Sequence, residues 1–101
     1  MVKHIVMWRL HDEVDGIGKI EAAATIKREL EALNGKIPGL LHIEVGIDFD
    51  RSEQAADIVL YSELESRDAL AAYQAHPLHQ AVVPLVKKYA CERIVVDYDV
   101  E

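Results

Sequence analysis

The segment from Tyr73 to His79 carries three side chains that could move a proton or stabilise a charge: Tyr73, His76 and His79. Tyr73 and His76 are three residues apart, so they share a face if the segment is helical. An imidazole titrates near neutral pH and can accept or release a proton there. A phenol hydroxyl can donate a hydrogen bond to a developing oxyanion. Together these groups suit proton abstraction from a carbon next to a carbonyl group.

His4 is a further candidate, in a segment where alternation places it on the same face as Val6 and Trp8. If that face meets the helices, His4, Tyr73 and His79 converge on one pocket with apolar walls. The alternative is two core histidines and a tyrosine, each satisfied by a hydrogen bond beside a helix break. Composition alone favours this alternative, because a lone motif is weak evidence for a site.

The elements that must position these side chains follow the order β-α-β-β-α-β. Alternating apolar residues predict strands, and apolar residues three or four apart predict helices. Pro77 should end one helix and open the next, and Pro84 should kink or split that second helix. The predicted strands are residues 2–10, 41–48, 56–64 and 92–100; the helices are 17–37, 66–76 and 77–89; and 11–16 is a polar loop.

This order is that of a ferredoxin-like α+β fold, in which a four-stranded antiparallel sheet carries its helices on one face. We expect residues 1–101 to form a single domain. The residues expected on the other face of the sheet are also mostly apolar. This predicts a second copy of the chain packed against that face in a two-fold homodimer. The alternative is a monomer with a few exposed aliphatic side chains. The residues assigned to this second face are Ile5, Met7, Leu40, Val59, Tyr61 and Val95.

The amino-acid composition excludes some classes of binding partner. The net charge of −7 argues against nucleic acid and against an anionic membrane surface. The chain enters a strand at once, which is unlike a signal peptide, and no apolar run reaches membrane-spanning length. The single cysteine, Cys91, suits a reducing compartment, so we expect a cytoplasmic protein. The acidic segment 48–53 lacks the ligand spacing of a calcium loop, and we predict no metal and no cofactor.

Five segments spread over nearly the whole chain together resemble the stress-responsive dimeric α/β-barrel domain family. They are Val2-Lys3-His4-Ile5-Val6, Ile37-Pro38-Gly39, Glu44-Val45-Gly46, the Tyr73-x-x-His76-Pro77-x-His79 block and Val96-Asp97-Tyr98. The resemblance implies a ferredoxin-like protomer whose homodimer forms a barrel from two four-stranded sheets.

The resemblance also implies roles for the candidate residues. A plant polyketide cyclase of this family closes a linear polyketide by an aldol condensation without a cofactor. By this likeness His79 is the general base and Tyr73 orients or polarises the carbonyl, so both are expected to be catalytic. His4 and His76 shape the pocket, and with Val6 and Trp8 they are expected to contact the substrate.

Three functions are compatible with these observations. The first is a cofactor-free enzyme or binder of small apolar or aromatic carbonyl compounds. The second is a non-catalytic stress protein whose useful property is a stable dimer. The third, a cofactor-free monooxygenase of a related barrel type, rests on analogy of fold alone.

Overall fold

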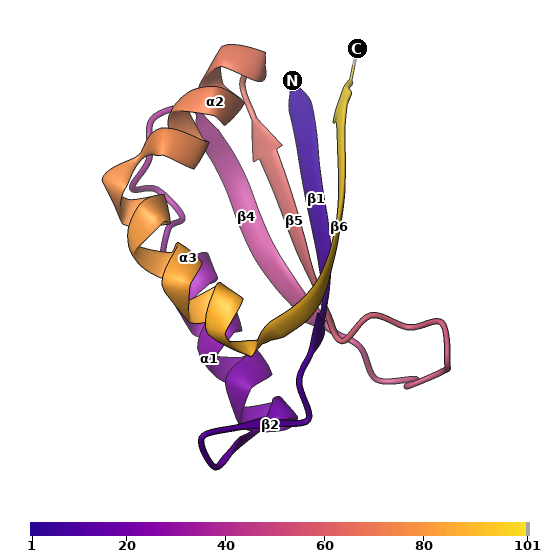
Figure 1. Cartoon of the computed structure of the whole chain (residues 1–101). Helices are drawn as coiled ribbons and strands as arrows, with labels where there is room; N and C mark the ends of the chain where they lie inside the picture. Colours follow the sequence, from indigo (N-terminus) through magenta and orange to yellow (C-terminus); the bar gives the residue numbers. More distant parts are fainter. Residues whose placement is uncertain (101) are drawn as a thin grey trace.

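A four-stranded antiparallel sheet with helices on one side forms the molecule (Figure 1). The computed structural model describes residues 1–100. The strands lie in the order β4-β5-β1-β6, which confirms the ferredoxin-like fold. The large strands are β1 (Val2–Leu10), β4 (Leu40–Ile47), β5 (Ile58–Leu64) and β6 (Ala90–Asp99), and the helices are α1 (Lys19–Glu31), α2 (Arg67–Ala75) and α3 (Pro77–Tyr89).

Strand β1 is a central strand and supplies much of the core. It pairs with β5 on one side and with β6 on the other. Because side chains alternate along a strand, every second residue faces the helices. His4, Val6 and Trp8 lie on that side and are at most 6% exposed. Ile26 and Leu30 of α1 and Val82 and Val86 of α3 are buried in the same core.

The opposite side of the sheet is not covered by any element within residues 1–100 (Figure 1). Its exposed apolar side chains adjoin across strands, since Met7 pairs with Ile94 and Ile5 with Val96. Ile94 is 64% exposed and Val96 is 54% exposed. We call this surface the bare face; its apolar residues are Ile5, Met7, Val59, Tyr61, Ile94, Val96 and Tyr98.

The prediction that Leu40 and Val95 belong to the bare face is wrong. Leu40 pairs with Leu64, and Val95 pairs with Val6, so both face the helices. A register shift between Leu40 and His42 displaces Leu41, which explains why the simple alternation misassigned the start of β4.

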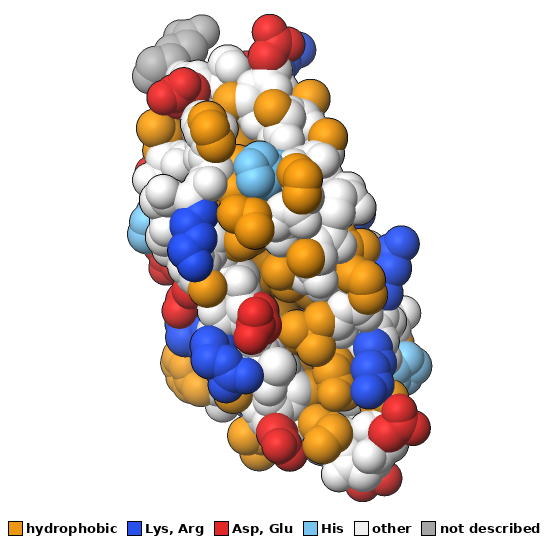
Figure 2. All heavy atoms as spheres, turned by 90° about the vertical axis from the view of Figure 1, so that its left-hand side faces the viewer, with side chains coloured by type: hydrophobic (Ala, Val, Ile, Leu, Met, Phe, Trp, Pro, Cys, Tyr) orange, Lys and Arg blue, Asp and Glu red, His pale blue; other side chains and the backbone are white. Residues whose placement is uncertain are grey.

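Apolar side chains are also exposed on the helical side, where the space-filling view shows them in a band between charged residues (Figure 2). Ile20 of α1 is 75% exposed and Leu78 of α3 is 41% exposed. Single exposed side chains such as Ile20 and Leu78 are ordinary in folded proteins. The bare face differs because no element within residues 1–100 covers that side of the sheet. No helix within residues 1–100 has the length and apolar character needed to cross a membrane.

A small hairpin, formed by β2 (Glu13–Val14) and β3 (Ile17–Gly18), begins in the predicted polar loop 11–16 and extends into the first residues of the predicted helix. Asp15 and Gly16 at its tip have φ of 52° and 82°. An Asp-Gly pair between apolar residues is the usual sequence of such a tight turn. The hairpin delays the start of α1 from residue 17 to Lys19.

Pro84 does not split the second helical region, because α3 runs unbroken from Pro77 to Tyr89. A proline leaves the carbonyl four residues earlier without its helical partner. That carbonyl belongs to Gln80, and both Gln80 and Pro84 are exposed, so water can hydrogen-bond to it.

Side chains of α1 and the turn that follows it cover the outer edge of β4. Lys27 Nζ donates to the Val45 carbonyl oxygen at 2.6 Å, and Glu31 Oε2 accepts from the Val45 N–H at 3.0 Å. The ion pair with Lys27 and this N–H hold the pKa of Glu31 below its usual value. Asn34 donates to the Ile43 carbonyl oxygen at 2.7 Å and accepts from the Ile43 N–H at 3.0 Å. These bonds satisfy polar groups that an edge strand otherwise leaves unpaired.

Replacing Asn34 should therefore weaken the fold. Asn34→Ala removes both bonds to Ile43, and we expect it to lower the free energy of unfolding by about 1–2 kcal/mol. Lys36→Ala, at a nearby exposed position, should change it by less than about 0.5 kcal/mol. Urea unfolding at one protein concentration measures both variants. Equal stability of the two variants would show that the edge bonds contribute little.

Candidate functional site

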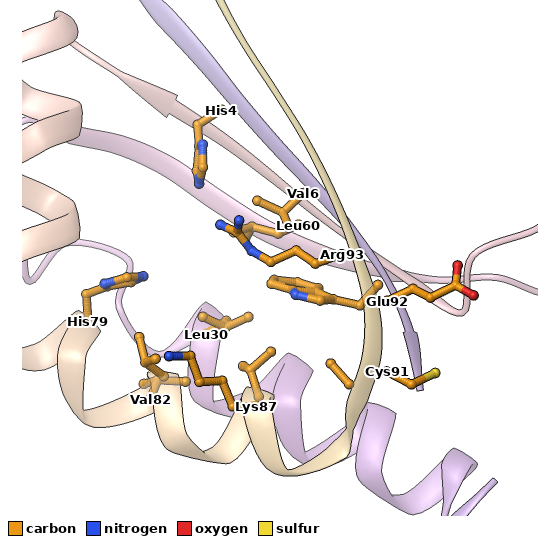
Figure 3. Close-up of a pocket in the computed structure, with 14 residues that line it drawn as sticks. His4, Val6, Leu30, Leu60, His79, Val82, Lys87, Cys91, Glu92 and Arg93 are labelled. Atoms are coloured by element: carbon orange, nitrogen blue, oxygen red, sulfur yellow. The ribbon is translucent and has the colours of Figure 1, made fainter. Parts of the chain in front are cut away.

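A cavity of about 370 Å³ lies between the sheet and α3, beside the first residues of β6 (Figure 3). Its walls are largely apolar and include Val6, Trp8, Leu60 and Val82. This volume is within the range of small-molecule sites. The polar and charged side chains among its lining residues are His4, His79, Lys87, Cys91, Glu92 and Arg93.

His79 enters the cavity from the first turns of α3 (Figure 3). Its Nδ1 lies 3.1 Å from the carbonyl oxygen of Gln74. Because a carbonyl oxygen only accepts hydrogen bonds, Nδ1 carries the proton, and Nε2 of the neutral ring holds a lone pair. Burial is the main cause that lowers the pKa of His79 from 6.5, so the ring is mostly neutral at pH 7. His79 thus has the protonation state of a general base.

Tyr73, on the last turns of α2, packs directly behind His79. The centroids of the two rings are 4.5 Å apart, and the ring of His4 is edge-on to Tyr73 at 6.2 Å. Tyr73 is 0% exposed, and its hydroxyl has no hydrogen-bond partner among residues 1–100. Burial raises its pKa to about 12, so it stays protonated at neutral pH. An unpaired buried hydroxyl destabilises the fold by about 1–3 kcal/mol, which marks it as a donor free for another molecule.

His4 lies on β1 and points into the cavity (Figure 3). Its Nδ1 is hydrogen-bonded to the carboxylate of Asp97, which is directly opposite on β6. This contact fixes the ring so that its other nitrogen, Nε2, is free to face the cavity. Asp97 was not among the residues expected at the site. The signal was present, because alternation along β6 groups Asp97 with Arg93 and Val95, but the strand register is needed to place it beside His4.

The structure does not bring His76 to the cavity. His76 is the N-cap of α3, and its Nδ1 accepts a hydrogen bond from the Leu78 N–H at 3.1 Å. Its position between α2 and α3 sets where α3 begins, and therefore where His79 lies. Of the predicted site residues, His4, Val6, Trp8 and His79 line the cavity, Tyr73 lies behind its wall, and His76 shapes the helix junction.

This arrangement can perform acid–base chemistry on an apolar molecule. A neutral imidazole can accept a proton, and apolar walls strengthen its interaction with a charge that develops nearby. No group of three or more His, Cys, Asp or Glu side chains within the described part of the chain is placed to hold a metal ion.

Known proteins resemble this chain in sequence or in structure. An uncharacterized protein of Streptomyces coelicolor is 32% identical over 100 residues, which is 98% of this chain and 99% of that protein. A dimeric protein of unknown function from Bacteroides fragilis with a ferredoxin-like fold is 35% identical, with a TM-score of 0.87 over 98% of this chain and 95% of that chain. A dimeric ferredoxin-like protein from Thermobifida fusca is 24% identical, with a TM-score of 0.84 over 98% and 90%.

Two enzymes are more distant matches and share the fold alone. A hydroxynitrile lyase from Passiflora edulis is 14% identical, with a TM-score of 0.80 over 99% of this chain and 93% of that chain. An antibiotic biosynthesis monooxygenase is 22% identical, with a TM-score of 0.77 over 100% and 99%. At these identities the activities do not transfer.

The family assignment rests on the whole chain. Residues 2–100 match the sequence model of Dabb, the stress responsive A/B barrel domain. The match includes every strand and helix described above and both histidines of the cavity. This chain therefore belongs to the stress responsive A/B barrel domain family.

Proposed function

We propose that this protein binds a small apolar or aromatic carbonyl compound in the cavity beside α3 and catalyses proton transfer next to its carbonyl group without a cofactor. The observation that carries this proposal is the pairing of His79 with Tyr73. The first is a neutral imidazole with its lone pair free in an apolar cavity. The second is a buried, protonated hydroxyl without a partner directly behind it.

In the proposed step, Nε2 of His79 takes a proton from the carbon next to the carbonyl group. The electron pair of the broken C–H bond forms a C=C bond, and the carbonyl π electrons move onto the oxygen. The Tyr73 hydroxyl donates a hydrogen bond to that oxygen as it becomes negative. Because Tyr73 is covered by the cavity wall, ligand binding must shift a neighbouring side chain to expose the hydroxyl.

The Tyr73-x-x-His76-Pro77-x-His79 block resembles that of olivetolic acid cyclase. This resemblance supports a polyketide-like ligand. A non-catalytic binding or stress-related role is the alternative, because family membership does not assign a reaction. A cofactor-free monooxygenase remains a further alternative on fold analogy alone.

We also propose a cytoplasmic location. The free Cys91 supports a reducing, cytoplasmic setting.

The proposed working unit is a homodimer joined through the bare face. Contiguous apolar residues on an uncovered sheet favour burial against a matching surface, and a second copy supplies one by symmetry. The loop between β4 and β5 projects to the same side (Figure 1) and carries Phe49, which is 92% exposed. The proteins from Bacteroides fragilis and Thermobifida fusca are both dimeric, which supports the same assembly here.

A charge on the bare face should abolish the dimer. Val96→Asp places a carboxylate in the middle of the predicted interface, where no partner compensates its desolvation. Val96 is 54% exposed in the protomer, so the protomer itself should fold. Light scattering should report a monomer for Val96→Asp and a dimer for Ile20→Asp, a matched change on α1. A dimeric Val96→Asp variant would place the interface elsewhere.

Exchange of carbon-bound hydrogen in D₂O tests the proposed chemistry without knowledge of the natural substrate. The protein should accelerate deuterium incorporation into the methyl group of acetophenone, followed by NMR. His79→Gln should reduce the acceleration by about 10²-fold or more, and Tyr73→Phe by about 10²-fold. His11→Gln, on an exposed loop, should leave it unchanged.

Two outcomes of that experiment count against the proposal. Binding of acetophenone without exchange favours the non-catalytic role. Equal exchange by the parent, His79→Gln and Tyr73→Phe would mean that the catalytic residues are wrongly assigned.

The exchange rate should also depend on pH in a defined direction. The neutral form of His79 is the base, and its pKa lies below 6.5. The rate should therefore be level near pH 7 and fall on acidification, with a midpoint below 6.5. Tyr73, with a pKa of about 12, should add no second transition between pH 6 and 9. A midpoint above 6.5 would contradict the buried, neutral state of His79.

A further inference from the structure

Two cationic side chains at the cavity have no acidic partner within the described chain. Lys87 of α3 and Arg93 of β6 both line the cavity and are exposed to solvent. No ion pair or side-chain hydrogen bond forms from either group to another of residues 1–100. In a chain with a net charge of −7, acidic side chains outnumber basic ones, so unpaired cations at one cavity are unexpected.

The other cations beside this region are paired. Arg9 lies 3.6 Å from Glu92, and Lys19 lies 3.3 Å from Asp57. Glu92 lines the same cavity, but its side chain points away from the interior (Figure 3). The Glu92 carboxylate therefore pairs with Arg9 on the opposite face of the sheet and does not neutralise the cations of the cavity.

Arg93 is directed into the cavity by the strand register. It pairs with Trp8, and paired residues share a face, so its side chain lies on the helical side of the sheet. Its guanidinium group extends across the cavity towards His4 (Figure 3). The charge of Arg93 also acts on His79, since after burial it is among the causes that lower the pKa of that imidazole.

The cavity therefore has a positive mouth and an apolar interior. A carboxylate placed at the mouth keeps part of its hydration, which avoids most of the desolvation penalty of a buried charge. A guanidinium group can bind a carboxylate through two parallel hydrogen bonds, and an ammonium group adds a second positive charge. The interior walls, Trp8 and Val82 among them, then contact an aliphatic or aromatic body.

We propose that the ligand of this cavity is an apolar acid, whose carboxylate is held by Arg93 and Lys87 while its body lies against Trp8. This inference rests on the proposed function, because it names the substrate class of the same site. It restricts the carbonyl compound to one that also carries a carboxylate, such as an aryl keto acid. Arg93 and Lys87 are then specificity-determining residues, and the proton transfer itself stays with His79.

Trp8 makes the test direct, because it is the only tryptophan of the chain and lines the cavity. Its fluorescence can be titrated at pH 7 with 3-phenylpropionate and with 3-phenylpropionamide, which has nearly the same shape but no charge. The parent protein should bind the acid about tenfold more tightly than the amide, as expected for a charge-assisted pair near solvent. Arg93→Met should remove most of this preference, because it weakens binding of the acid far more than binding of the amide.

Two further variants refine the result. Lys87→Met should reduce the preference by a smaller factor, because an ammonium group lacks the two-point geometry. Arg28→Met removes the same charge from the exposed side of α1 and should keep the full preference, which excludes an effect of net charge.

The outcomes separate this inference from the proposed function. Equal affinity for acid and amide, or an unchanged preference in Arg93→Met, overturns the carboxylate assignment and leaves the small-molecule site standing. No response of Trp8 to either compound overturns both.

Discussion

The register of β1 is the constraint on which the rest of the structure depends. β1 is hydrogen-bonded on both sides, and its alternate residues serve opposite faces of the sheet. A slip by one residue would move His4 and Trp8 to the bare face. Two polar contacts oppose such a slip: the Ser62 hydroxyl donates to the His4 carbonyl oxygen at 2.8 Å, and Asp97 holds the His4 ring. Both contacts lie between residues that are paired across strands, so they exist only in the observed register.

This register lets one thin sheet serve two purposes. Residues of β1 that face the helices form the floor of the cavity, and those that alternate with them form the centre of the bare face. The proposed dimer and the proposed site therefore use opposite sides of the same strand and compete for no residue. The helix junction completes the site: His76 caps α3, Pro77 begins it, and His79 follows within one turn, packed on Tyr73.

Much of the fold could be predicted from local patterns, because alternation and helical spacing are properties of short segments. What required the tertiary structure were relations between segments. The bulge that exposes Leu41 and the position of Asp97 beside His4 depend on strand register, which no single segment encodes. Arg93 and Lys87 come from different elements and line the same cavity only in the folded chain. The hairpin at Asp15-Gly16 is different, because its turn signal was present in the sequence and was overlooked.

If the helical side of β1 and the start of α3 enclose a site for a small apolar molecule, bound acetophenone should lie there. Intermolecular nuclear Overhauser effects from bound acetophenone would test it most directly. We expect contacts from the ligand to the indole of Trp8 and the imidazole of His79. Contacts to Ile94 and Val96 on the bare face, with none to Trp8 or His79, would contradict it.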